Sequence, residues 1–92
     1  MVERDAEIVN KFGLHARPAM QFVNEANRFA SRIEVSKGEL TVDAKSIMSV
    51  MRLAATKGTI LTITADGDDA SDAVDALAQL IQDGFGEMGE ES

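Results

Sequence analysis

Four short segments of the chain alternate between apolar and polar residues, which is the pattern of a β-strand that buries one of its faces. They cover residues 2–8, 32–36, 40–42 and 61–65. Lys37 and Gly38 lie between the second and third segments and predict a tight turn, so these two segments are expected to form a hairpin. The pattern therefore predicts four strands that share one buried face.

Apolar residues at helical spacing follow the first strand and predict a helix that begins at about residue 16. The spaced residues are Ala19, Phe22, Val23, Ala26 and Phe29. Pro18 falls in the first turn of this helix, where the N–H that proline lacks would have no helical partner. His15 is therefore expected to cap the helix or to lie immediately before it.

Two further helices are predicted after the third and fourth strands. Ser46 precedes an apolar stretch at residues 47–53 and is expected to be the N-cap of a short helix, because its hydroxyl can accept from an unpaired N–H. Carboxylates crowd the start of the last helix, where they favour the helix dipole: Asp68, Asp69, Asp72 and Asp75. Its apolar face consists of Ala70, Ala73, Val74, Leu77, Leu80 and Ile81, and Gly84 is expected to end it.

The predicted order is βαββαβα in a single domain over residues 1–85, followed by a frayed acidic tail at residues 86–92. Four strands with one apolar face need helices to cover that face. The fold class is therefore α+β: a two-layer sandwich in which three helices cover one face of a four-stranded, mainly antiparallel sheet.

Composition narrows the possible functions. The 92 residues contain no cysteine and one histidine, so a thiolate site or a dedicated zinc site is not expected. A net charge of −7 argues against binding to nucleic acid. The charged N-terminus and the lack of a long apolar run predict a cytoplasmic protein without a signal peptide or membrane insertion.

Charge is unevenly distributed along the chain. Acidic residues concentrate at residues 66–75 and 86–92, whereas five basic residues lie in the first 52 positions: Lys11, Arg17, Arg28, Lys45 and Arg52. A basic face of this kind would suit an acidic protein partner, because complementary charge orients the encounter and raises its rate. The alternative is ordinary solvated surface charge.

His15 lies in the segment Gly-Leu-His-Ala-Arg-Pro-Ala at residues 13–19. The N–H groups of Ala16 and Arg17 would have no acceptor within the helix, and together with the helix dipole they form a site for a phosphoryl group. Arg17 can add a charged, bidentate contact to phosphate oxygens. These residues predict a nucleophilic histidine that takes up phosphate. A capping or core histidine is the alternative.

Residues 13–19, together with Lys-Ser-Ile-Met-Ser-Val-Met at residues 45–51, resemble HPr, the histidine-containing phosphocarrier family of the bacterial phosphoenolpyruvate:sugar phosphotransferase system. The resemblance extends from residue 2 to about residue 85. It implies an open-faced β-sandwich in which phosphorylated enzyme I transfers a phosphoryl group to Nδ1 of His15. His15 would pass the group to an enzyme IIA-type acceptor, with Arg17 neutralising charge during transfer. The chain would be a carrier rather than an enzyme and would need no cofactor or metal.

The resemblance also implies that Ser46 is a regulatory phosphorylation site for HPr kinase/phosphorylase. Capping alone would explain a serine at this position. The apolar residues Phe12, Ile47, Met48 and Met51 are expected to form a partner-docking patch, with two of the last three pointing outward. The alternative is that Ile47, Met48 and Met51 belong to the core.

Three positions depart from the family pattern. Many members have a polar residue in place of Phe12, and many have glycine in place of Ser49 and Ala54. Phe12 and the acidic composition leave open a nitrogen-related or mainly regulatory paralogue that uses the same His15 chemistry. A non-transferring interaction module is a further alternative, and in each case a monomer is expected.

Overall fold

The computed structural model describes residues 1–86, and the order of its elements confirms the predicted βαββαβα arrangement. The strands are β1 (Val2–Glu7), β2 (Arg32–Lys37), β3 (Leu40–Asp43) and β4 (Ile60–Asp66). The helices are α1 (Ala16–Ala26), α2 (Ile47–Met51) and α3 (Ala70–Gln82), followed by the short 3₁₀ turn η1 (Gly84–Gly86). Only η1 was not predicted.

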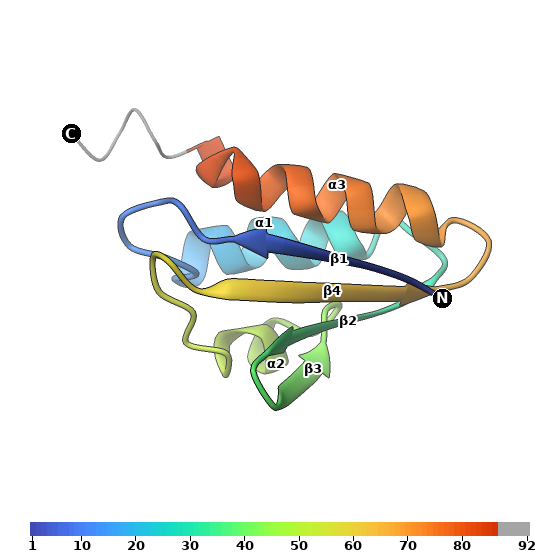
Figure 1. Ribbon diagram of the computed structural model, residues 1–92, viewed down its shortest axis with the longest axis horizontal. Helices are drawn as coiled ribbons and strands as arrows, with labels where there is room; N and C mark the ends of the chain where they lie inside the picture. Colours follow the sequence, from blue (N-terminus) through green and yellow to red (C-terminus); the bar gives the residue numbers. More distant parts are fainter. Residues whose placement is uncertain (87–92) are drawn as a thin grey trace.

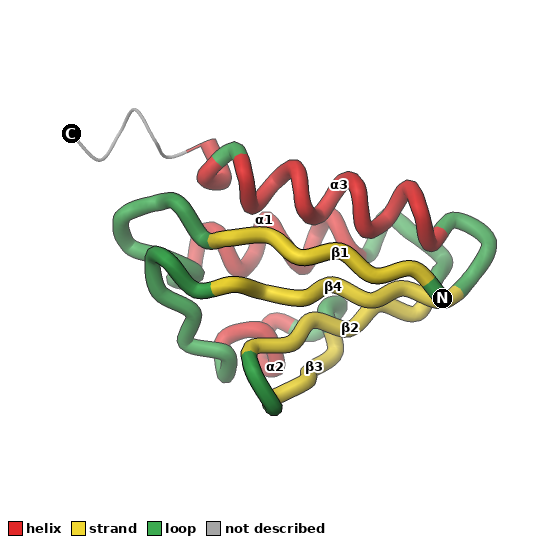
Figure 2. The backbone as a smooth tube through the Cα atoms, in the orientation of Figure 1, coloured by secondary structure: helices red, strands yellow, loops and turns green. Residues whose placement is uncertain are grey.

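The four strands form one sheet in the order β1-β4-β2-β3, and each neighbouring pair is antiparallel. Figures 1 and 2 show β1 and β4 in front of α1, with α3 along the edge of the sheet next to β1. The other face of the sheet is open. The fold is therefore the predicted two-layer, open-faced sandwich, and its sheet is antiparallel throughout.

The core lies between the sheet and the helices. Alternate strand residues such as Val35, Leu61 and Ile63 are buried, as are Phe22 of α1 and Leu77 of α3. On the open face, Glu3, Thr64 and Glu34 stand opposite one another across three strands. The period of two in each strand thus separates an apolar face from a polar one.

Helix α1 ends earlier than the apolar spacing predicted. Its last residue is Ala26, and Phe29 lies beyond the helix, half-buried against the core. Asn27 ends the helix because its side-chain Nδ2 donates to the carbonyls of Val23 (2.9 Å) and Lys45 (3.2 Å). The N–H of Phe29 bonds to the Ala26 carbonyl in a tighter, i to i−3 turn.

Two loops at one end of the sheet are joined by backbone hydrogen bonds. Ile8 donates to Thr59 (2.9 Å) and accepts from Gly58 (2.7 Å), which continues the pairing of β1 with β4. Farther along, the N–H of Leu14 donates to the Ala55 carbonyl (2.8 Å). We call this set of contacts the loop seam. It holds the segment before α1 against the segment before β4.

At the opposite end of the molecule, Asp69 joins the start of α3 to the loop after α1. Its carboxylate accepts from the N–H groups of Ala30 (2.8 Å) and Ser31 (2.9 Å) and from the Ser31 hydroxyl. Hydrogen bonding by the Ser31 hydroxyl, followed by the Ala30 N–H, lowers the pKa of the Asp69 carboxyl below its usual value. A second tie is the ion pair between Arg4 of β1 and Asp75 of α3 (2.7 Å).

Of the predicted tail, Gly86 closes η1, and residues 87–92 lie outside the described residues. Within residues 1–86, no helix combines the length and the apolar character that crossing a membrane requires.

Gly13→Ala is expected to lower the free energy of unfolding by about 2–4 kcal/mol. Gly13 has a positive φ of 66°, and an added Cβ would lie 2.4 Å from the Ala55 carbonyl oxygen in the loop seam. Gly38→Ala is the matched control: its φ is also positive at 57°, but a Cβ there meets nothing within 4 Å. Gly38→Ala should lower the free energy of unfolding only by the backbone strain, about 1 kcal/mol. Urea denaturation measures the loss of stability in both variants, and equal losses would contradict close packing at Gly13.

Asp69→Asn is expected to make the protein less stable at pH 7 and less sensitive to acid. Because the folded-state pKa of Asp69 is lowered, its stabilisation is complete above the ordinary carboxyl pKa of about 3.9 and is lost as the pH falls below it. Urea denaturation at pH 7 and pH 3 measures this difference. The neighbouring exposed Asp68, changed to Asn, is the control. An acid loss in Asp69→Asn as steep as that of wild type would contradict the assignment.

Candidate functional site

His15 is the N-cap residue of α1, as predicted. Its backbone is extended (φ −83°, ψ −172°), and its carbonyl accepts the N–H of Ala19 at 2.9 Å. Its side chain makes no capping hydrogen bond, and the residue is half-exposed. His15 is therefore not a fully buried core histidine.

The start of α1 is arranged to receive an anion. The N–H groups of Ala16 and Arg17 have no acceptor within the helix, because the first intrahelical bond is made by Ala19. No acidic residue lies in the first turn of α1, whereas the first turn of α3 contains Asp72. The positive end of the α1 dipole therefore has no carboxylate of its own turn to balance it.

Arg17 lies in the first turn of α1, two residues after His15, and is exposed. Guanidinium groups offer paired N–H donors to phosphate oxygens, which is the reason for the prediction that Arg17 contacts a phosphoryl group on His15. Within residues 1–86, no three His, Cys, Asp or Glu side chains are grouped as metal ligands.

Phe12 lies beside His15. The two rings meet edge to face, with centroids 6.0 Å apart and planes at 83°. The ammonium of Lys11 lies 5.3 Å from the centre of the Phe12 ring. Phe12 is 63% exposed, so its ring offers apolar surface directly next to the imidazole.

Ser46 is the N-cap of α2, as predicted, and its Oγ accepts the Ser49 N–H at 3.3 Å. The residue is half-buried. Lys45, immediately before it, donates through Nζ to the Phe29 carbonyl (2.7 Å) just after α1. Ser46 therefore lies near the end of α1, whereas His15 lies at its start, about 15 Å away along an 11-residue helix.

Helix α2 runs back along α1 from Ser46 toward His15. Its beginning is tied to the end of α1 through Lys45, and the loop that follows it reaches Leu14 through the Ala55 carbonyl. The exposed apolar residues of α2 thus lie between the two predicted phosphorylation sites.

All three predicted apolar residues of α2 are exposed, with Met48 at 76%. Val50, on the other side of this short helix, is fully buried and supplies its packing contact. The alternative that Ile47, Met48 and Met51 form part of the core is therefore wrong. We define the apolar patch as the exposed residues Phe12, Ile47, Met48, Met51 and Met20.

Met20 is an addition that the sequence reasoning missed. It is exposed on α1, one turn beyond Ala16, and does not belong to the buried positions 19, 22, 23 and 26. An apolar residue off the buried stripe of a helix was the available signal.

Asn10 was also missed: it is fully buried, and its Nδ2 donates to the Gly13 carbonyl at 2.8 Å. Asparagine followed by glycine three residues later is a turn signal.

The predicted basic face is smaller than the sequence suggested. Arg28 pairs with Glu25 on its own helix (3.0 Å), whereas Lys45 donates to the neutral Phe29 carbonyl and keeps its charge. Arg17 and Arg52 remain exposed on α1 and just after α2. Positive charge around the apolar patch therefore comes from fewer residues than the five in the sequence.

Ala54 is one of the departures from the family pattern, and its backbone shows why glycine suits this position. It has a positive φ of 47°, in the region where glycine is favoured. The chain thus retains, with alanine, the backbone conformation that leads from α2 into the loop seam.

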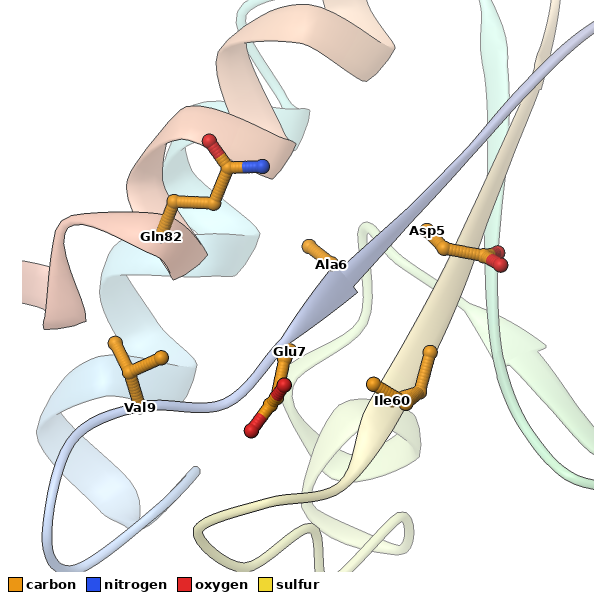
Figure 3. Close-up of a pocket in the computed structure, with 6 residues that line it drawn as sticks. All are labelled: Asp5, Ala6, Glu7, Val9, Ile60 and Gln82. Carbon is orange, nitrogen blue, oxygen red and sulfur yellow. The ribbon is translucent and has the colours of Figure 1, made fainter.

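A pocket of about 330 Å³ lies on a different part of the surface, between β1, the start of β4 and the end of α3 (Figure 3). It is lined by Asp5, Ala6, Glu7, Val9, Ile60 and Gln82. None of the predicted site residues lines it, and its two carboxylates are unsuited to phosphate. This pocket and the His15 site are therefore separate parts of the surface.

Comparison with known proteins agrees with this geometry. The family model described as PTS HPr component phosphorylation site, where PTS is the phosphotransferase system, matches residues 2–83. Phosphocarrier protein HPr of Haemophilus influenzae is 51% identical over 81 residues, covering 88% of this chain and 95% of that protein. The HPr-like protein Crh of Bacillus subtilis is 46% identical over 83 residues, covering 90% and 98%.

Among solved structures, the crystal structure of HPr from Thermoanaerobacter tengcongensis matches with a TM-score of 0.91 and 48% identity, covering 95% of this chain and 98% of that one. Fold, sequence and the family model thus agree over nearly the whole chain. The chain belongs to the HPr family, the phosphocarrier proteins of the phosphotransferase system.

Proposed function

We propose that His15 accepts a phosphoryl group from phosphorylated enzyme I and passes it to enzyme IIA-type domains that serve sugar uptake. The observation that carries the proposal is that His15, which is not fully buried, is the N-cap of α1, where the helix N–H groups begin and exposed Arg17 follows two residues later. The chain acts as a carrier, so the partners supply the rest of the transfer machinery.

Each transfer exchanges one bond to phosphorus for another. The lone pair of the His15 ring nitrogen, Nδ1 by resemblance to the family, forms the new N–P bond. The bond between phosphorus and the donor breaks, and its electron pair stays with the donor. In the second transfer a nucleophile of the enzyme IIA-type acceptor forms a new bond to phosphorus, the N–P bond breaks, and its electron pair returns to the imidazole. The helix start and Arg17 stabilise the negative charge on the phosphoryl oxygens during both steps.

The apolar patch is the proposed docking surface for enzyme I and the acceptors. Met48 and Phe12 are its most exposed members, and methionine adapts to partners of different shape. Exposed Arg17 and Arg52 add positive charge, which suits acidic partner surfaces. Docking on the patch would bring the reacting groups together at its edge, because Phe12 is a member of the patch and its ring lies against the His15 ring.

Ser46 is proposed as the site at which HPr kinase/phosphorylase regulates the carrier. Its hydroxyl caps α2, so a phosphate there would gain from the helix start rather than unfold it. The added negative charge would stand beside Ile47 and Met48 and repel an acidic partner.

A mainly regulatory branch that uses the same His15 chemistry is the second candidate, and it includes the nitrogen-related phosphotransferase system. The observation that favours it is that the chain matches the HPr-like protein Crh about as well as it matches phosphocarrier HPr proteins. A panel of purified acceptor domains separates the two, because only the first candidate requires transfer to sugar-specific enzyme IIA domains. In both, we propose that the protein works in the cytoplasm as a monomer.

Incubation with enzyme I and phosphoenolpyruvate is expected to give one acid-labile phosphate per chain, and His15→Ala should carry none. Arg17→Ala should still be labelled, but at a rate lower by about tenfold or more, because one charged contact to the transferring group is lost. Quenched-flow labelling measures both, and circular dichroism checks that the variants are folded. Acid-labile label in His15→Ala would refute the site. Equal rates for Arg17→Ala and wild type would remove Arg17 from the transfer.

Ser46→Asp is expected to raise the KM of enzyme I for this protein by about tenfold, because negative charge is placed beside the docking surface. The thermal midpoint should change by no more than about 3 °C, since a carboxylate is itself a good N-cap. Ser71→Asp is the control: it adds the same charge in the first turn of α3 and should leave KM unchanged. If both variants raise KM equally, general charge rather than the position of Ser46 is responsible.

A further inference from the structure

The peptide group that joins Gly13 to Leu14 is hydrogen-bonded at both of its ends. Its carbonyl accepts from the Asn10 side-chain Nδ2 at 2.8 Å. Its N–H donates to the Ala55 carbonyl at 2.8 Å. A third bond, from the Gly13 N–H to the Asn10 carbonyl (3.1 Å), closes the turn that carries this peptide. The plane of the peptide is therefore fixed from two directions, one residue before His15.

Asn10 is an unusual residue for its surroundings. Its side chain is completely buried, whereas most buried side chains of this domain are apolar. A buried amide lowers stability unless its hydrogen bonds are made, so packing alone would favour an apolar residue of similar size. The bond from Nδ2 to the Gly13 carbonyl supplies a reason for asparagine at this position.

Little freedom remains between the fixed peptide and the imidazole. Leu14 is anchored by its buried side chain, and the His15 carbonyl is already committed to the N–H of Ala19. The His15 backbone thus joins a fixed peptide to a helix, which leaves the side-chain rotations as the main movement of the ring. The edge of the ring faces Phe12 at 6.0 Å between centroids.

We propose that Asn10 is a positioning residue for His15: by holding the Gly13–Leu14 peptide, its buried amide orients the imidazole toward the incoming phosphoryl group. The proposal rests on the phosphoryl-carrier function of His15 described above. Asn10 does not touch the reacting atoms. It reduces the set of orientations that the ring nitrogen must search before attack, and such prealignment raises the rate of the chemical step rather than the affinity for the partner.

The test compares Asn10→Ala with Asn27→Ala. Both remove an asparagine amide that donates to backbone carbonyls, but Asn27 lies at the opposite end of α1 from His15. Asn10→Ala is expected to lower kcat for phosphorylation by enzyme I about tenfold and to leave KM within about twofold. Asn27→Ala should leave both constants within about twofold of wild type. Equal kcat values for Asn10→Ala and wild type, measured where both are folded, would overturn the proposal.

A second donor separates this proposal from the proposed function. Phosphoramidate needs no protein partner: its phosphoryl group moves to the imidazole nitrogen, and ammonia leaves with the electron pair of the broken P–N bond. Asn10→Ala should react with it more slowly than wild type, and nitrogen NMR should show a changed tautomer ratio for His15. If enzyme I fails to phosphorylate wild type while these differences are seen, the carrier function fails and the positioning role stands. If enzyme I phosphorylates both proteins equally fast, the carrier function stands and the positioning role fails.

Asn10→Asp covers the possibility that Asn10→Ala does not fold. Aspartate keeps the size of the side chain and suits the first position of the turn, but at neutral pH it has no side-chain donor. It is expected to show the same loss of kcat. In the wild-type protein, the Asn10 amide protons should exchange slowly with solvent both before and after phosphorylation of His15. Rapid exchange in either state would overturn the proposal even if neither variant can be studied.

Discussion

The loop seam is the constraint on which the site depends. Backbone hydrogen bonds between the segment before α1 and the segment before β4 fix where the chain enters α1, and hence where His15 stands. Gly13 permits the two backbones to approach because a side chain there would collide with the Ala55 carbonyl. A histidine placed on a loop without these ties would be exposed but not oriented, and the start of α1 would not be presented to a partner.

The same constraint suits the site to a carrier. His15 is not fully buried, as the proposed arrival of a phosphoryl group from one protein and its departure to another require. In the proposed function the attraction for phosphate comes from helix N–H groups and one arginine, which would orient an anion without retaining it. The two long helices differ accordingly: the first turn of α3 contains Asp72, whereas the first turn of α1 has no acidic residue.

Much of this could be predicted from the sequence, because it depends on local patterns. Alternation predicted the strands, and Pro18 after His15 predicted the start of α1. What was missed depends on contacts between distant segments. Phe29 continued the helical spacing, but the Asn27 amide bonds to the carbonyl of Lys45 and ends the helix first. Asn10 offered a turn signal, yet its burial depends on how the rest of the chain packs around it. To predict that Met20 is exposed, one must know which side of α1 faces the core.

The central claim is that His15, held at the start of α1, carries the phosphoryl group on a ring nitrogen while its supporting loop stays in place. Phosphorus and nitrogen NMR of the nitrogen-15-labelled protein, recorded after reaction with enzyme I and phosphoenolpyruvate, tests it most directly. We expect one phosphorus signal coupled to a ring nitrogen of His15, with the Leu14 amide still protected from exchange. A phosphorus signal without nitrogen coupling, or loss of Leu14 protection on phosphorylation, would contradict the account.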